Sequence, residues 1–227
     1  MISSSTSRAD GFQGSEKGIA KPIRLNKRIL LEGVQYLESK DEHLRWIRSK
    51  FGLPPLWKRE QGFNTLIHII LGQQVSLASA KAAYKKLLMN RNPLTPANFI
   101  KLSDDQLKRI GFSRQKTSYG RNVAHAIIEG RLDLSEFAYL NDMEAKERLM
   151  KIRGIGSWTA DIYLLTALGR PDIWPNGDLA LAVAVQKLKG LGKRPSPGEL
   201  RTMSLEWKPW RAVAARILWH YYLSNRT

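Results

Sequence analysis

Apolar residues recur along most of the chain at intervals of three and four, which is the spacing of an α-helix with one buried face. We find no stretch with the strict alternation of a β-strand and no hairpin turn signal. The segment 178–188 is apolar on nearly every side and predicts a buried helix, whereas 210–221 predicts a strongly amphipathic last helix. Ser76 fits the N-cap of another helix, over 77–88. Apolar residues at the same helical spacing also occur over residues 29–37, 44–51, 63–71, 119–127 and 160–168.

This pattern predicts an all-α fold of about ten short helices joined by short loops. Residues 1–24 differ from the rest because they are rich in Ser and Gly, carry mixed charge and show no apolar period. We therefore predict a disordered tail over 1–24, closed by Pro22, and one helical domain over 25–227.

The charge of the chain narrows the choice of partners. Its 227 residues include 37 Lys and Arg against 20 Asp and Glu, a formal net charge of +17. Such an imbalance favours binding to a polyanion, of which nucleic acid is the commonest. Charge alone leaves open a merely basic protein, or one that binds an anionic membrane surface.

The composition excludes several kinds of chemistry. The sequence contains no cysteine, which rules out disulfides, thiolate zinc sites, cysteine-ligated iron–sulfur clusters and a cysteine nucleophile. Apolar runs such as 66–71 are too short to span a bilayer, and the first residues lack the apolar stretch of a secretory signal. A reducing, intracellular compartment is the simplest interpretation.

A glycine-punctuated turn lies between two helical patterns, at 152–160. Gly154 and Gly156 flank the apolar Ile155, and such a turn can expose backbone N–H groups at the start of the following helix. A DNA phosphate fits that position, since the helix dipole also favours an anion there. Ile155 would then point inward. An ordinary helix–helix turn explains the same residues.

Asp178 stands at the start of the predicted buried helix, so its carboxylate is expected near the interior. Asp is a good N-cap, and a capping role is compatible with a catalytic one because capping would hold the side chain rigidly. Aromatic residues are frequent around it, and as a set they suggest a pocket that stacks a flat, cationic base. They are Trp158, Tyr163, Trp174, Trp207, Trp210, Trp219 and Tyr221.

Four ordered motifs carry a specific resemblance. They are 70–76 (ILGQQVS), 154–160 (GIGSWTA), 175–178 (PNGD) and 207–211 (WKPWR). In this order and spacing the chain, over roughly 60–225, resembles the helix-hairpin-helix DNA glycosylase superfamily, and within it the 3-methyladenine DNA glycosylase II branch.

That resemblance implies two helical lobes with DNA bound in the cleft between them: a central lobe over 60–170, and a second lobe made of 25–59 plus 171–227. It implies that Asp178 is the catalytic aspartate and that the hairpin Gly154, Ile155, Gly156 and Ser157 binds phosphate. The backbone carbonyls of Met150, Ile152 and Ile155 would match a sodium or potassium site. The base pocket would include Trp158, Trp219 and Tyr163, and Gln73 and Gln74 would fill the gap left by the flipped nucleotide.

The chain departs from some relatives in ways that matter for chemistry. Family members that also cut the backbone carry a lysine nucleophile where this chain has Trp158, and an indole cannot form a Schiff base. Gln74 replaces an aliphatic wedge, and the helical pattern upstream of residue 60 leaves no room for a β-rich N-terminal domain. Basic contacts to phosphates are expected from Lys151, Arg153, Arg114 and Lys116.

Together these features predict a monofunctional DNA glycosylase that removes alkylated bases such as 3-methyladenine and 7-methylguanine from double-stranded DNA. It would act as a monomer, without a required cofactor and away from membranes. Two alternatives stay open: a non-catalytic DNA-binding module, and a glycosylase for oxidised or deaminated bases. The four histidines show no metal-ligand spacing, and His68, inside an apolar helix, is interpreted as a core residue.

Overall fold

The regular structure is entirely helical. The computed structural model describes residues 22–225, and within them twelve α-helices and two 3-10 helices form without any strand. The all-α prediction is confirmed. The count exceeds the expected ten because three helices of five to seven residues escaped the periodicity analysis, since one or two turns repeat a 3.6-residue pattern too few times to be recognised.

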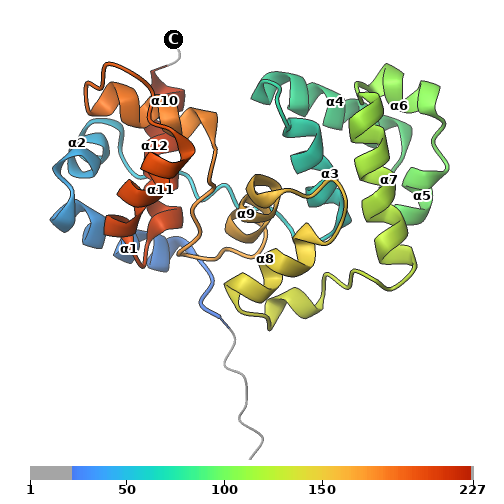
Figure 1. Ribbon diagram of the computed structural model, residues 1–227, viewed down its shortest axis with the longest axis horizontal. Helices are drawn as coiled ribbons and strands as arrows, with labels where there is room; N and C mark the ends of the chain where they lie inside the picture. Colours follow the sequence, from blue (N-terminus) through green and yellow to red (C-terminus); the bar gives the residue numbers. More distant parts are fainter. Residues whose placement is uncertain (1–21, 226–227) are drawn as a thin grey trace, which may run out of the picture.

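One group of helices comes from the middle of the chain, and we call it the central lobe (Figure 1). Its core is α3, which packs against α4, α7 and α9, while α8 packs against α9. The helices of this lobe are α3 (Phe63–Gly72), α4 (Leu77–Asn90), α5 (Pro96–Ile100), α6 (Asp104–Ile110), α7 (Arg114–Ile128), η1 (Glu136–Ala138), α8 (Asp142–Met150) and α9 (Ser157–Thr166).

The second group combines the two ends of the described chain, and we call it the terminal lobe (Figure 1). Its central helix is α12, which packs against α1, α2, α10 and η2. The helices of this lobe are α1 (Lys27–Lys40), α2 (Glu42–Phe51), α10 (Leu179–Leu188), α11 (Pro197–Met203), η2 (Ser204–Trp207) and α12 (Arg211–Ser224). The predicted two-lobed fold is confirmed.

Most of these helices begin at a residue whose side chain caps the helix N-terminus. Ser76 caps α4 as predicted, with its hydroxyl accepting from the Ser79 N–H at 3.1 Å. Capping boxes, in which the cap and the third helical residue bond each other's backbone N–H, begin α6, α8 and α11 at Ser103, Asn141 and Ser196.

The predicted tail lies largely outside the described residues. Its last part is folded, however, because the Arg24 guanidinium donates to the Leu168 carbonyl at 3.0 Å and the Leu25 N–H donates to the Gly169 carbonyl at 2.7 Å. The boundary at residue 24 was therefore wrong by a few residues. These bonds attach the start of α1 to the end of α9.

The prediction of an amphipathic last helix was also wrong. In α12 the consecutive residues 212–218 are all buried, so the helix is surrounded by protein rather than lying at the surface. Small alanines let neighbouring helices approach closely on its several sides. Even the charged Arg216 is only 1% exposed.

The buried guanidinium of Arg216 connects the two lobes. It donates to the Leu56 carbonyl at 2.9 Å, to Ala212 in its own helix at 3.0 Å and to Leu165 of α9 at 2.8 Å. Burial lowers the pKa of Arg216 to about 10. One side chain thus joins α12, α9 and the segment that runs between the lobes.

Replacing Arg216 with methionine should destabilise the protein. The long apolar side chain fills the volume but leaves the Leu56 and Leu165 carbonyls without their donor, so the free energy of unfolding should fall by about 2–5 kcal/mol. Arg148→Met, which removes a half-exposed ion pair with Glu136, is the control and should cost less than about 1 kcal/mol. Urea unfolding followed by circular dichroism measures both. Equal stabilities of the two variants would contradict the bridging role.

Candidate active site

Asp178 occupies the N-cap of α10, as its place in the sequence predicted. One carboxylate oxygen, Oδ1, accepts from the Leu181 N–H at 3.0 Å. The residue is 8% exposed, so the carboxylate is near the interior but not sealed from solvent. The cap fixes the direction of the side chain.

Two tryptophans hold the same carboxylate. The Trp158 indole donates to Oδ2 of Asp178 at 2.9 Å, and the Trp219 indole donates to Oδ1 at 3.1 Å. Trp158 belongs to α9 of the central lobe and Trp219 to α12 of the terminal lobe. The sequence analysis singled out these three residues, and the structure brings them together where the lobes meet.

The hydrogen-bonding capacity of the carboxylate is not exhausted. Two carboxylate oxygens offer about four lone-pair sites, and they accept here from three donors: Trp158, Trp219 and the Leu181 N–H. Oδ2, which carries a single bond, retains a direction in which it can accept from a water molecule.

A third tryptophan, which the sequence analysis missed, completes the aromatic group. Trp57 packs edge to face on Trp219, with ring centroids 6.3 Å apart. Its backbone has a φ of 43°, a left-handed conformation that is unusual for a bulky residue and that only the surrounding fold can hold. Trp57 lies two residues after the Pro54-Pro55 break, and no sequence pattern marks it as part of the site.

Most of the other aromatic residues named from the sequence are structural. Trp174 and Trp207 are buried and pack on each other with centroids 5.3 Å apart. The Trp210 ring lies over α1, where a Cβ on Gly33 would come within 2.7 Å of it. Fewer of the indoles named from the sequence therefore lie at Asp178 than the sequence suggested.

The prediction that Tyr163 lines the base pocket needs correction. Its side chain is fully buried, and its hydroxyl accepts from the Gly62 N–H at 3.0 Å. Burial raises the pKa of Tyr163 to about 12. A side chain without exposed surface cannot touch a bound base in this conformation, so Tyr163 supports the site from within.

The hairpin between α8 and α9 requires a glycine at one of its two glycine positions, Gly154. Gly154 has a φ of 104°, and a Cβ there would come within 2.4 Å of the Tyr119 ring. Gly156 has open space around it, so the backbone is accessible at the start of α9. Ile155 is 3% exposed and points inward, as expected.

The start of α9 lacks a side-chain cap. Gly156 at the N-cap cannot supply one, and no side chain caps the first backbone N–H groups of the helix, which have no carbonyl of a preceding turn to donate to. Side chains bond the hairpin carbonyls instead: Gln73 donates to Gly154 at 3.2 Å and Asn122 donates to Arg153 at 3.2 Å. The arrangement presents donors and suits an anion.

The two glutamines of the α3–α4 turn have different roles. Gln73 bonds Gly154 and also the Thr159 hydroxyl at 2.9 Å, so its side chain is occupied in fastening the turn to the hairpin. Gln74 is exposed and has a φ of 55° at the tip of the turn. Of the pair, Gln74 is the one whose side chain is free to enter a groove.

The basic residues named from the sequence also differ from one another. Lys151, Arg153 and Arg114 are exposed beside the hairpin and at the start of α7. The Lys116 ammonium instead donates to the Leu71 carbonyl at the end of α3 at 2.7 Å, and burial lowers its pKa. Lys116 is therefore partly engaged in the fold.

Among the described residues, no group of three or more His, Asp or Glu side chains could hold a metal ion. The carbonyls proposed for a monovalent cation lie in the hairpin, and one of them, that of Ile152, already accepts from the Ile155 N–H at 3.0 Å. Residues 22–225 also contain no helix of the length and hydropathy that crossing a membrane requires.

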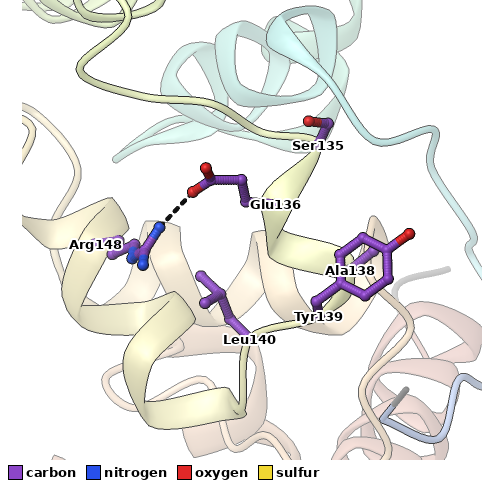
Figure 2. A pocket seen from close by; sticks show the side chains of 6 residues that line it. All are labelled: Ser135, Glu136, Ala138, Tyr139, Leu140 and Arg148. Atoms are coloured by element: carbon purple, nitrogen blue, oxygen red, sulfur yellow. Dashed lines mark hydrogen bonds and ion pairs between the residues drawn. The ribbon is translucent and has the colours of Figure 1, made fainter. Parts of the chain in front are cut away.

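The structure has an open hollow elsewhere, of about 510 Å³, between η1 and α8 (Figure 2). An ion pair between Arg148 and Glu136, 2.5 Å apart, lies across its wall. The residues that line it do not include any of the candidate site residues. They are Ser135, Glu136, Ala138, Tyr139, Leu140 and Arg148.

His68 lies on α3 in a polar cluster at the surface of the central lobe. Its ring stacks on Tyr84 with centroids 4.1 Å apart, and the Arg59 guanidinium lies 2.5 Å from its Nδ1. Burial, together with the charge of Arg59, lowers the pKa of His68 to about 4. The interpretation as a core residue was partly wrong, because His68 is half-buried.

Comparisons with known proteins point to one family. Residues 67–210 match the family model described as HhH-GPD superfamily base excision DNA repair protein. A putative DNA-3-methyladenine glycosylase of Bacillus subtilis, YfjP, is 30% identical over 165 residues, which is 69% of this chain and 58% of that protein. DNA-3-methyladenine glycosylase 1 of Schizosaccharomyces pombe is 30% identical over 166 residues, 71% of this chain and 73% of that one.

A solved structure shares the whole two-lobed arrangement. The 3-methyladenine DNA glycosylase Mag1 of Schizosaccharomyces pombe, in complex with abasic DNA, superimposes with a TM-score of 0.78 at 28% identity. The match covers 83% of this chain and 95% of that one. This chain spans a little over half the length of two Bacillus subtilis relatives: 58% of YfjP and 57% of a second protein named DNA-3-methyladenine glycosylase.

The titration of His68 predicts a pH dependence of stability. In the unfolded chain His68 becomes protonated as the pH falls below about 6.5, whereas in the folded state it stays neutral until about pH 4. The free energy of unfolding should therefore fall as the pH drops through this window. Because the ring is only half-buried, we expect a contribution of about 1 kcal/mol. His68→Phe keeps the stack on Tyr84 and should show a shallower decline, with a constant offset from wild type above pH 7. If the stabilities of wild type and His68→Phe fall in parallel from pH 7 to pH 4, His68 is not the group responsible.

Proposed function

This chain belongs to the HhH-GPD superfamily of base excision DNA repair proteins, as the four sequence motifs suggested, and we propose that it is a monofunctional DNA glycosylase for alkylated bases. The proposed substrates are 3-methyladenine and 7-methylguanine in double-stranded DNA. The observation that carries the proposal is the Asp178 carboxylate, held between the indoles of Trp158 and Trp219 where the two lobes meet.

The aromatic group suits the leaving base. A base in a duplex is out of reach, so the nucleotide must leave the stack, which costs a few kcal/mol and least for damaged pairs. Alkylation at a ring nitrogen makes the purine cationic, and a cation is attracted to the face of an indole. Trp57, Trp158 and Trp219 supply such rings beside the carboxylate.

Asp178 performs the chemistry in this proposal. Breaking the N-glycosidic bond leaves positive charge on the deoxyribose while the base departs as a neutral molecule. The fixed carboxylate stabilises that charge through space, and the free lone pair on Oδ2 orients the attacking water and accepts its proton. The product is a free base and an abasic sugar.

The hairpin binds the DNA backbone and does not distinguish one base sequence from another. The uncapped N–H groups at the start of α9 bind a backbone phosphate, and exposed Lys151, Arg153 and Arg114 lie where they add charge. Gln74 at the tip of the α3–α4 turn fills the gap that the flipped nucleotide leaves. Lys116 contributes less, because the Leu71 carbonyl already holds its ammonium.

The carbonyls of Met150, Ile152 and Ile155 could hold a sodium or potassium ion in this account. Neutral oxygen donors suit a weakly charged cation, which would brace the hairpin backbone against the phosphate. The proposed reaction itself requires no cofactor. We further propose a monomer that works where the cell keeps its DNA, because the site is built from one chain.

The absence of an amine beside the carboxylate limits the reaction. Trp158 stands where backbone-cutting relatives carry their lysine, and an indole nitrogen cannot form a Schiff base with the sugar. The proposed reaction therefore ends at base release and leaves the strand intact.

Asp178→Asn should abolish base release while duplex binding persists. The amide keeps the N-cap and the bond from Trp219 but removes the negative charge, so single-turnover release of 3-methyladenine should fall by about 10²–10⁴-fold. Affinity for an abasic duplex should change by no more than a few fold. Chromatography of released bases and fluorescence anisotropy measure the two quantities.

A matched double variant separates charge from geometry. In Asp178→Asn the new amide N–H₂ faces the Trp158 N–H, and two donors cannot bond each other; adding Trp158→Phe removes that clash. The double variant should stay as inactive as the single one. Recovery of base release in the double variant, or wild-type release by Asp178→Asn alone, would show that the charge of Asp178 is dispensable.

A further inference from the structure

Three polar side chains form a cluster that has no part in the proposed chemistry. They belong to Arg59, His68 and Tyr84, and we call them the Arg59 cluster. Nη1 of Arg59 donates to Nδ1 of His68 at 2.5 Å, and the His68 ring stacks on the Tyr84 ring with centroids 4.1 Å apart. The segment that connects the lobes, α3 and α4 each supply one member.

The Arg59 guanidinium lacks an anionic partner in the part of the chain that the structure describes, because every ion pair there joins other residues. Glu60, the next residue, is exposed and takes part in none of these pairs. Arg59 itself is partly buried, and burial lowers its pKa. A cation in such surroundings is costly unless an anion meets it.

The cluster also keeps hydrogen-bond donors unused. Nε and Nη2 of Arg59 bond nothing among residues 22–225, yet neither is one of the buried polar atoms that lack a partner, so both reach solvent. The same is true of Nε2 of His68 and of the Tyr84 hydroxyl. Because Nδ1 of His68 accepts from Arg59, the proton of the neutral imidazole lies on Nε2 and makes it a donor.

The backbone places this cluster beside the candidate active site. The Arg59 N–H donates to the Thr166 carbonyl at 2.9 Å, which fixes Arg59 against α9, the helix that carries Trp158. Trp57, which packs on Trp219, is two residues from Arg59. The Cα atoms of Trp57 and Arg59 are therefore no more than about 7 Å apart.

The cluster also lies next to the turn between α3 and α4. His68 is four residues before Gly72, the last residue of α3, and positions four apart share a face of a helix. Gln74, which fills the gap in the proposed function, follows Gly72 by two residues. A DNA strand that sends one nucleotide to Asp178 and receives Gln74 in its place has its backbone close to this face.

We propose that the Arg59 cluster binds a phosphate of the DNA backbone next to the flipped nucleotide. The inference rests on the proposed function, which supplies that nucleotide. Nε and Nη2 form an edge of the guanidinium that matches the two free oxygens of a phosphate diester, and His68 and Tyr84 add single donors. This phosphate is distinct from the one at the hairpin and supplies the anion that Arg59 lacks. The contact holds the extruded backbone and reads no base.

A scan of the DNA phosphates tests the site. Abasic duplexes are prepared in which one phosphate near the abasic site at a time is replaced by a neutral methylphosphonate, and fluorescence anisotropy gives the affinities. Arg59→Met removes the donors but keeps the backbone bond to Thr166. Arg131→Met is the matched control, because it removes the same charge from an arginine that is paired with Glu129.

One phosphate should couple to Arg59. At that position the methylphosphonate should weaken binding by wild type and by Arg131→Met about tenfold, and binding by Arg59→Met by less than about threefold. On unmodified abasic duplex, Arg59→Met should bind about tenfold more weakly than wild type, with a salt slope smaller by about one. His68→Phe keeps the stack but loses one donor, and it should bind about threefold more weakly.

Two results would overturn the inference. One is an equal loss of affinity in Arg59→Met and Arg131→Met, which would reduce the effect to net charge. The other is a methylphosphonate profile of Arg59→Met that matches wild type at every position. If Arg59→Met does not fold, Arg59→Lys decides, because it keeps the charge but loses the guanidinium edge: a weaker effect at the one phosphate supports the site, and a wild-type profile opposes it.

The proposed function fails by a different measurement. Wild-type protein that shows the coupled phosphate but releases no base would refute the glycosylase and keep the phosphate site. Wild-type protein that releases base while Arg59 couples to no phosphate would refute the site and keep the glycosylase.

Discussion

The site depends on one carboxylate that both lobes share. Asp178 begins α10 of the terminal lobe, receives one indole N–H from α9 of the central lobe and receives another from α12 of its own lobe. Each bond is an ordinary one, but together they fix the side chain and the relation between the lobes at the same point. Moving the lobes apart would break the bond from Trp158, so the catalytic geometry in this account is a property of the whole fold.

The protein reinforces this junction with buried polar groups. Arg216 ties α12 to α9 and to the connecting segment, and the buried Asp161 of α9 is bonded by Lys146 of α8 and by Ser157. Buried polar groups are costly unless they are satisfied, and once satisfied they favour a single arrangement over looser alternatives. A catalytic carboxylate that must face a sugar from one direction needs such a junction. In the proposed function, the positive charge of the chain, +17, has the separate role of attracting the duplex.

Much of this could be predicted from the sequence where local signals are strong. The 3.6-residue periodicity indicated the long helices, and the motif order indicated Asp178, Trp158, Trp219 and the hairpin. The failures have a common cause, since they involve residues whose environment is set by distant parts of the chain. The segment 210–221 looked amphipathic because the sequence does not show that protein surrounds α12, or that three carbonyls accept from its Arg216.

The aromatic residues show the same limit. Tyr163 and Trp219 are equally plausible pocket residues by type and position, yet the fold buries one and places the other on the Asp178 carboxylate. Trp57 reaches the site only because the connecting segment adopts a left-handed turn there, which no pattern in the sequence indicates. Composition predicted an aromatic pocket, and tertiary contacts decided its members.

The most direct measurement is a product analysis with the wild-type chain. Duplex DNA treated with a methylating agent is incubated with the protein, the small-molecule fraction is identified by mass spectrometry, and the strands are examined before any treatment with alkali. The account predicts free 3-methyladenine and 7-methylguanine with intact strands that contain abasic sites. Tight binding to the duplex without any released base, or strands cut before alkali, would contradict it.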